Sequence, residues 1–323
     1  DYRLGGNEAP PSVISVFLGE QLEDVLEQLI STGVATHSKK GSKLHTGVKT
    51  LPDFMKDATD RNRTSPFAFT GNKFEFRMVG SRDSISECNV VLNTIAAQAF
   101  KEACDRLEAA PDFALAVHDL IKEYATDHQR IVFNGNGYAP EWAEEAERRG
   151  LPNLPSMVDA IPALTTEKAV SLFEEFHVFT RAELESRAEI QYEIYAKAIN
   201  IEAKTMLDIT TKQIIPAVIK YTTVLAQSIN AVRAAAAVDV GVQTSLLEKC
   251  SSRLSETDKA MGVLADAVAH IGDYPEGRER AVYCREKVVK AMEELRKPVD
   301  ELEMLVDKEM WPMPSYGDLI FEV

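Results

Sequence analysis

The sequence lacks several features that mark specialised classes of protein. Its 323 residues hold only four cysteines, which show neither C-x-x-C spacing nor the density of a disulfide scaffold. No uninterrupted apolar run approaches the roughly 20 residues that a membrane helix needs. The 36 Lys and Arg against 51 Asp and Glu leave no positive excess to attract nucleic acid or anionic lipid. We therefore expect a reduced, globular, cytoplasmic protein with no nucleic-acid or membrane partner.

The chain also lacks a charged-then-apolar leader, and it begins with Asp1 rather than Met. Its first residue suggests a processed chain or a fragment. The 45% hydrophobic content is enough for one large domain or two ordinary ones, each with its own core.

The first part of the chain mixes strand and helix signals. A β-like run, V-I-S-V-F-L, leads into a helical pattern that ends near Ile30, and two short aromatic strands follow around a T-G-N turn. Helices are predicted over residues 88–107, 112–128 and 141–149, the last ending at Gly150. The fold class expected for residues 1–150 is therefore α+β.

From Leu164 onward the pattern is almost entirely helical. The longest element is predicted from Arg181 to Ala236, with a kink at Pro216, because proline removes a helical hydrogen bond. Further helices are predicted over residues 244–271 and 275–309. Residues 151–323 are thus expected to form an antiparallel, all-α helical bundle domain.

The stretch N-K-F-E-F-R-M alternates apolar and charged residues, which predicts a strand with distinct faces. Lys73, Glu75 and Arg77 should share one face. The simplest interpretation is a solvated edge of a hairpin. However, Arg61 and Arg63 precede the first strand, and several guanidinium groups around one carboxylate are costly unless an anion or metal shares the space. Phosphate with a divalent cation would satisfy both charges.

These residues carry a family resemblance. The string N-R-T-S-P-F-A-F-T-G-N-K-F-E-F-R resembles the end of the catalytic domain of glutamine synthetases, and the opening R-L-G-G-N-E-A-P resembles the flap segment of that family. The flap match is one residue shorter than the family pattern. The form of both motifs, the long insertion between them and the helical C-terminal extension resemble the type III class. The resemblance covers nearly the whole chain.

The resemblance implies roles for individual residues. Glu75 matches a ligand of a divalent metal, and Arg77 matches a catalytic arginine that binds the substrate and the developing phosphoryl intermediate. Arg63 matches an arginine on the nucleotide phosphates, which would also make it catalytic. Lys73 stands where many relatives have a phosphate-binding arginine. The flap residues implied are Arg3, in cofactor binding, and Glu8, which closes the site and accepts a proton from ammonium.

The activity implied is ATP-dependent ligation of ammonia to glutamate through γ-glutamyl phosphate, with Mg²⁺ or Mn²⁺. The assembly implied is a homo-oligomer, a dodecamer of two hexameric rings. Family members take most metal ligands from strands upstream of the flap, where this sequence begins. We therefore expect the isolated chain to be inactive.

Two alternatives are open. The helical, acidic segment from Leu164 to Lys308 suits a non-catalytic oligomerisation or interaction module. A related ligase that joins glutamate to another amine would use the same phosphate and metal residues.

Other candidates carry less weight. His37 and His45 lie in a Lys-rich segment without metal-ligand spacing and are expected in a solvated loop. The G-N-G of residues 135–137 lacks a dinucleotide-binding pattern and is predicted to be a turn, and the acidic run from Glu141 to Glu147 is predicted to be an exposed helix face.

Overall fold

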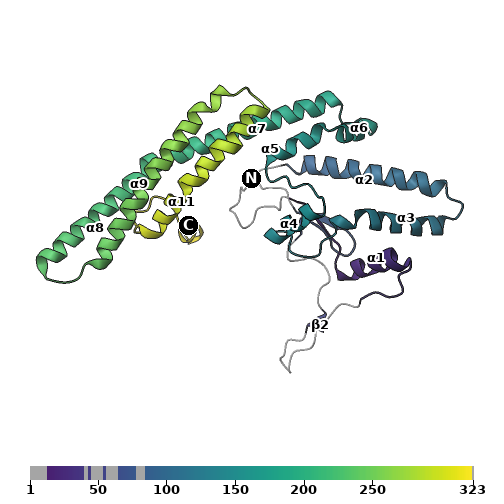
Figure 1. Ribbon diagram of the computed structural model, residues 1–323, viewed down its shortest axis with the longest axis horizontal. Coiled ribbons are helices and arrows are strands. Elements are labelled where there is room, and N and C mark those ends of the chain that lie inside the picture. Colours follow the sequence, from purple (N-terminus) through teal and green to yellow (C-terminus); the bar gives the residue numbers. More distant parts are fainter. Residues whose placement is uncertain (1–12, 40–42, 45–53, 56–64, 78–83, 322–323) are drawn as a thin grey trace. The chain divides into compact units, whose positions relative to one another are not determined.

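The computed structural model in Figure 1 describes residues 13–39, 43–44, 54–55, 65–77 and 84–321. The chain divides into two compact units, Asp1–Leu184 and Glu185–Val323. The domain boundary expected near residue 150 stays a prediction.

The first unit contains a small mixed sheet. Its strands are β1 (Val16–Phe17), β4 (Phe67–Phe69) and β5 (Phe74–Phe76), in the order β1-β4-β5. β1 runs parallel to β4, and β4 runs antiparallel to β5, which confirms the predicted aromatic hairpin. β2 (Lys43–Leu44) and β3 (Phe54–Met55) form a separate antiparallel pair.

Six α-helices accompany this sheet among the described residues. They are α1 (Glu20–Thr32), α2 (Ile85–Glu108), α3 (Phe113–His128), α4 (Pro140–Arg148), α5 (Met157–Ala160) and α6 (Glu167–Glu175). Ser84 and Asp112 cap α2 and α3, because their side-chain oxygens accept backbone N–H bonds from Ser86 and Leu115. α3 lies beside both α1 and α2 (Figure 1). The three helices predicted from periodicity are therefore confirmed, with shifts of at most a few residues.

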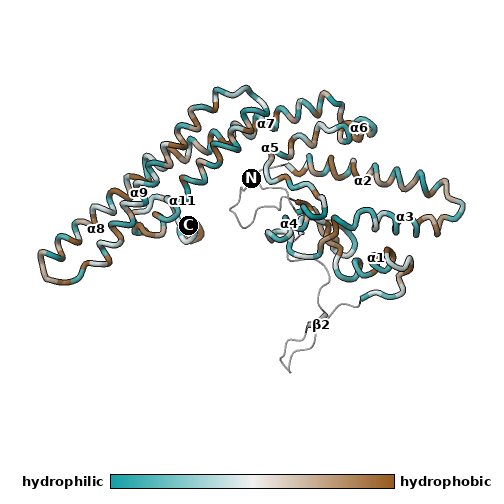
Figure 2. The backbone as a smooth tube through the Cα atoms, in the orientation of Figure 1, coloured by the Kyte–Doolittle hydropathy of each residue, from teal (hydrophilic) through white to brown (hydrophobic). Residues whose placement is uncertain are grey.

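The long helices of the second unit pack side by side. α7 (Arg181–Ile209) begins in the first unit and continues into the second, where it is followed by α8 (Ile215–Ala235), α9 (Gly241–Ala269), α10 (Arg278–Tyr283), α11 (Lys290–Leu305) and α12 (Tyr316–Phe321). α9 packs against both α8 and α11 (Figure 1). Hydrophobic and hydrophilic positions alternate along each of them (Figure 2), as expected for helices that bury one stripe. The core between them contains Ile214, Val218, Cys250, Leu302 and Val306.

The long element predicted from Arg181 to Ala236, with a kink at Pro216, is interrupted just before that proline. Residues Thr210–Ile214 make a π-helical turn between α7 and α8. Proline has no N–H, and its ring clashes with the carbonyl four residues earlier, here that of Lys212. Widening the turn just before Pro216 avoids this clash. A second π-helical segment, Cys284–Val289, joins α10 to α11 and was not predicted.

No helix in the described part of the chain is both long enough and apolar enough to cross a membrane.

Candidate functional site

The hairpin of β4 and β5 brings three of the predicted site residues together. Glu75 lies opposite Ala68, whereas Phe67 pairs with Phe76 and Phe69 pairs with Phe74. Because directly paired residues of adjacent strands point to the same side, Glu75 and Ala68 share one face and the aromatic rings share the other. The predicted separation of charged and apolar faces is confirmed.

The aromatic face packs through rings from both strands. The Phe67 and Phe74 rings stack with centroids 5.2 Å apart, and those of Phe69 and Phe74 lie 5.3 Å apart. Phe74 is nevertheless 46% exposed, while Ala68 on the charged face is fully buried. The apolar face is therefore only partly buried, because Phe74 lies beside the exposed turn at Gly71 and Asn72.

The charged face is organised around the Glu75 carboxylate. Arg77 donates to Glu75 Oε2 from Nη2 at 2.9 Å and from Nε at 3.2 Å, while Lys73 Nζ lies 3.5 Å from Oε1. Hydrogen bonding to Arg77 is the main reason that the pKa of Glu75 lies below its usual value. Glu75 is therefore an ionised carboxylate, with both oxygens close to cations.

Exposure differs sharply along this face. The side chain of Arg77 is 16% exposed, that of Glu75 38% and that of Lys73 66%. The backbone N–H of Arg77 also donates to Pro66 O at 2.7 Å, which continues the hairpin pairing beyond β5. Arg77 is thus the most firmly held of the three, and Lys73 is the most free to reach a ligand.

The other predicted site residues lie outside the described residues. These are Arg3, Glu8 and Arg63, together with Arg61. Their proximity to the hairpin and their roles stay predictions.

Glu75 is the one predicted metal ligand among the described residues. They contain no group of three or more His, Cys, Asp or Glu side chains placed to hold a metal ion. Glu75 has the hard carboxylate oxygens that Mg²⁺ and Mn²⁺ prefer, but it supplies one ligand. The donor set fits a role as one member of a larger site whose other ligands come from elsewhere.

A cavity of about 610 Å³ lies between α1 and the end of α3. Its walls include Leu26, Ile30 and Tyr124, together with the charged residues Glu23 and Arg130. None of its lining residues belongs to the hairpin. The cavity is therefore separate from the described hairpin.

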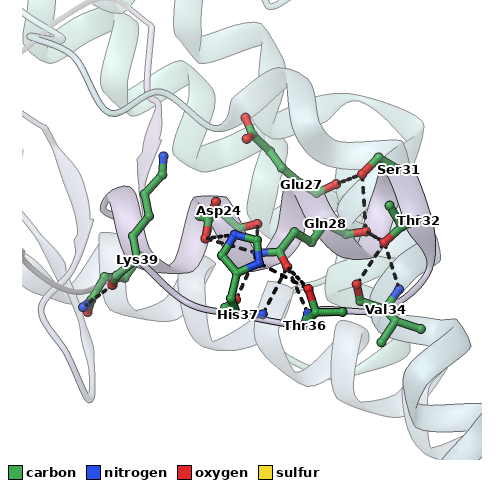
Figure 3. A network of polar contacts seen from close by, with 10 residues as sticks. Asp24, Glu27, Gln28, Ser31, Thr32, Val34, Thr36, His37 and Lys39 are labelled. Atoms are coloured by element: carbon green, nitrogen blue, oxygen red, sulfur yellow. Dashed lines mark hydrogen bonds and ion pairs between the residues drawn. The ribbon is translucent and has the colours of Figure 1, made fainter.

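The segment after α1, which holds His37, is folded back along that helix (Figure 3). Gln28 Oε1 accepts from the backbone N–H of Thr36 at 3.0 Å, and Gln28 Nε2 donates to His37 O at 3.0 Å. The His37 ring is 67% exposed and faces Asp24 at 4.0 Å. The exposed position predicted for His37 is confirmed, and α1 extends to Thr32, two residues beyond the predicted end.

The structure also reveals buried polar contacts that sequence patterns did not predict. Trp142 of α4 is 1% exposed, and its Nε1 donates to Val13 O at 3.1 Å. Asn134 accepts from the backbone N–H groups of Leu18 and Gly19, both at 3.0 Å. These pairs are more than a hundred residues apart in the sequence, so no local spacing signals them. The one available hint was a lone tryptophan within an otherwise acidic helix.

Comparison with known proteins gives matches along the entire chain. The family model of the glutamine synthetase C-terminal domain matches residues 116–233. The chain is 37% identical over 331 residues to a type-3 glutamine synthetase of Dictyostelium discoideum, with 99% of this chain and 45% of the relative covered. It is 36% identical over 337 residues to a glutamine synthetase of Butyrivibrio fibrisolvens, with coverage of 100% and 46%.

A glutamine synthetase of Bacteroides fragilis is 32% identical over 333 residues, with 99% of this chain and 45% of the relative covered. The chain thus spans less than half the length of these relatives. The similarity runs through both the hairpin and the helices, and it agrees with the resemblance carried by the hairpin motif. The chain is therefore similar along its whole length to glutamine synthetases, one of them of type 3, and its residues 116–233 match the family model of the glutamine synthetase C-terminal domain.

Proposed function

We propose that the protein containing this chain ligates ammonia to glutamate in the cytoplasm, with ATP as the phosphoryl donor. The observation that carries the proposal is the charged face of the hairpin, where Lys73, Glu75 and Arg77 lie within one connected ion-pair group. The relatives named glutamine synthetase support the same activity.

The reaction requires two anions to meet. The γ-carboxylate of glutamate attacks the terminal phosphorus of ATP, which forms γ-glutamyl phosphate and releases ADP. Ammonia then attacks the acyl carbon, a C–N bond forms, the C–O bond to phosphate breaks, and the ammonium loses a proton. Both steps need cations that neutralise phosphoryl charge and a base for the proton.

The hairpin supplies part of this requirement on a rigid element. Arg77 is held by Glu75 with its guanidinium largely buried, so it binds the γ-carboxylate side and the phosphoryl group without first being ordered. Lys73 is exposed and reaches nucleotide phosphate as a single charge rather than as a fork. Arg63 and Arg3 complete the phosphate contacts, and Glu8 accepts the proton.

Glu75 would hold one divalent metal ion together with ligands from outside the described residues. A bound metal would neutralise phosphate charge. Because Glu75 alone among the described residues serves this role, we propose that the isolated chain does not complete a catalytic cycle. Glutamate-dependent ADP release from a preparation verified to contain only these residues would contradict that proposal.

The test uses the full-length gene product that contains this chain. Glutamine formation from ATP, glutamate and ammonium is compared between the native protein and Glu75→Ala. A matched control is Glu123→Ala, because Glu123 also accepts a bidentate pair, from Arg106, on the exposed faces of α2 and α3. Loss of activity in Glu75→Ala alone supports the proposal. Equal activity in all three proteins would overturn it.

We also propose that the protein is a homo-oligomer, a dodecamer of two hexameric rings, with helices from the second unit in its contacts. The support is an exposed apolar series on α7, in which Ile190, Ile194 and Ile201 are 49%, 53% and 65% exposed at helical spacing. Sedimentation of the full-length protein as a monomer at micromolar concentration would contradict this. An oligomer without any ligase activity would instead favour the alternative of a non-catalytic interaction module.

A further inference from the structure

The cavity of about 610 Å³ beside α1 has the size of a small-molecule site, since such pockets typically measure about 300–1,000 Å³. It lies within the first unit, where α1 packs against α3 (Figure 1). One wall is a single face of α1, whose lining residues recur at helical spacing. They are Glu23, Leu26, Glu27 and Ile30. The other wall is the continuous stretch from Tyr124 to Val132, at and beyond the end of α3.

Part of the cavity is lined by apolar side chains that the protein leaves half-buried. Leu26 and Ile30 contribute from α1, and Ile131 and Val132 from the other wall. The Tyr124 ring adds an aromatic surface beside them. Removing such surface from water is favourable. A ligand with hydrocarbon groups therefore gains binding free energy by covering it.

Carboxylates predominate among the charged groups of the cavity. Glu23 and Glu27 lie one helical turn apart on α1, and Asp127 belongs to the other wall. Two arginines, Arg130 and Arg149, also line the cavity, while His128 adds charge only when it is protonated.

Arg149 is already paired with a carboxylate outside the cavity lining. Its Nε donates to Glu145 Oε1 at 2.5 Å, and its Nη1 donates to Val132 O at 2.8 Å. Among the lining residues, Arg130 is then the one arginine left to balance three carboxylates. The cavity therefore carries net negative charge and favours a cation over an anion.

The two walls each offer a carboxylate with no partner among the described residues. On α1 this is Glu27, of which only the backbone carbonyl takes part in the contacts of Figure 3, where it accepts from the Ser31 hydroxyl at 2.7 Å. On the other wall it is Asp127. Glu23 differs, because its Oε2 accepts from Asn134 Nδ2 at 2.5 Å, and this neutral amide leaves its charge in place.

The spread of these carboxylates argues against a metal ion. No three His, Cys, Asp or Glu side chains of the described ranges are placed to hold one. The negative charge is divided between two walls, with apolar surface also lining the cavity. An extended organic cation matches such an arrangement better than a point charge does.

We propose that this cavity binds a small aliphatic diamine. One ammonium group pairs with Glu27 and the other with Asp127, through charge-assisted hydrogen bonds. The methylene groups lie against Leu26 and Ile30, and the Tyr124 ring attracts the cationic end near it. The site belongs to the described part of the first unit, and its existence does not depend on the proposed ligase function.

Calorimetric titration of the full-length protein with 1,4-diaminobutane tests the proposal. We expect Glu27→Gln and Asp127→Asn each to weaken binding about tenfold, the loss expected for one hydrogen bond between charged groups. Glu20→Gln is the matched control, because it removes the same charge from the same helix and Glu20 does not line the cavity. Binding in this control should equal that of the native protein.

Three related probes separate the contributions of charge and hydrocarbon. Relative to 1,4-diaminobutane, 1-aminobutane lacks one ammonium group and should bind about tenfold more weakly. 1,4-Butanediol has no charge and should not bind measurably. Equal affinity for the diamine and the diol would overturn the proposal, because the carboxylates would then play no part.

The variants also locate the binding. No binding of the diamine to the native protein would overturn the proposal, as would equal weakening by Glu20→Gln and Glu27→Gln, which would indicate general attraction to an acidic surface. Glu75→Ala should bind the diamine as the native protein does, since Glu75 does not line the cavity. Loss of binding in Glu75→Ala alone would place the amine at the hairpin and overturn the proposal. If Glu27→Gln does not fold, as judged by circular dichroism, Asp127→Asn decides.

Discussion

The contacts that stabilise the first compact unit internally differ in kind from those that stabilise the second. In the first, strands of two or three residues are joined by hydrogen bonds between positions far apart in sequence, such as Asn134 and Leu18. In the second, α8 and α9 span 21 and 29 residues and bury continuous apolar stripes. The charged candidate site therefore lies in the unit whose strands are only two or three residues long. A helix can be stabilised along its length by local bonds, whereas a short hairpin needs support from the rest of the unit.

The largest expected effect concerns the hairpin of the first unit. We expect Arg77→Lys in the full-length protein to lower kcat by about 10²–10³, because lysine keeps the charge but cannot make the paired contacts of a guanidinium. Steady-state glutamine synthesis measures the loss. Arg106→Lys is the control, since Arg106 makes the same two-bond contact with Glu123 away from the hairpin. Equal rates in the two variants would remove Arg77 from the catalytic group.

The second unit should respond in stability. Leu302 is fully buried in the cluster with Val218 and Cys250, so Leu302→Ala removes packed methyl groups and leaves a cavity. Such changes cost about 2–5 kcal/mol. Met304, two positions away, is 85% exposed, and Met304→Ala should change stability by no more than about 0.5 kcal/mol. Urea unfolding followed by circular dichroism compares the two variants, and similar midpoints would contradict the packing of α11.

The helices of the second unit were largely predictable, because their signal repeats every turn. Tyr195, Ile199 and Ala203 recur at helical spacing in the sequence, and all three are buried. The π-helical segment from Cys284 to Val289 gives no such signal, because it depends on how α10 meets α11 rather than on a residue such as proline. The regular helices could therefore be predicted from the sequence, whereas an interruption could be predicted only next to Pro216.

In the first unit, the hairpin and its charged face were predictable from strict alternation and from the T-G-N turn. The contacts that position the hairpin were not. The parallel pairing of β1 with β4, and the bridge from Val16 to Val132, depend on closure of long loops, which no short sequence window encodes. Trp142 was placed within an exposed acidic helix face, yet its ring is buried because α4 packs one side against Val13.

Thiol reactivity provides a third contrast between the units. Burial raises the pKa of the Cys284 thiol in the second unit to about 11, while Cys104 of α2 is exposed. Since the thiolate is the reactive form, a pKa two units above the ordinary value reduces reactivity about a hundredfold, before steric exclusion is counted. Alkylation of the native protein at pH 8, followed by mass spectrometry, should label Cys104 long before Cys284. Equal labelling without denaturant would mean that α10 and α11 open readily.

The smallest expected effect concerns the end of the second unit. Asp318 of α12 pairs with Lys308 at 2.8 Å and accepts from the N–H and hydroxyl of Ser315, and these bonds lower its pKa from 3.8 to about 2. A carboxyl whose pKa is depressed in the folded state contributes stability above its unfolded pKa and loses it as the pH falls through the folded value. The docking of α12 should therefore persist at pH 4 and weaken towards pH 2.

A carbon-detected NMR titration of the Asp318 carboxyl measures the midpoint, and Lys308→Ala should move that midpoint upward while the Ser315 bonds keep it below 3.8. A midpoint at the ordinary value in the native protein would mean that α12 is not docked through Asp318.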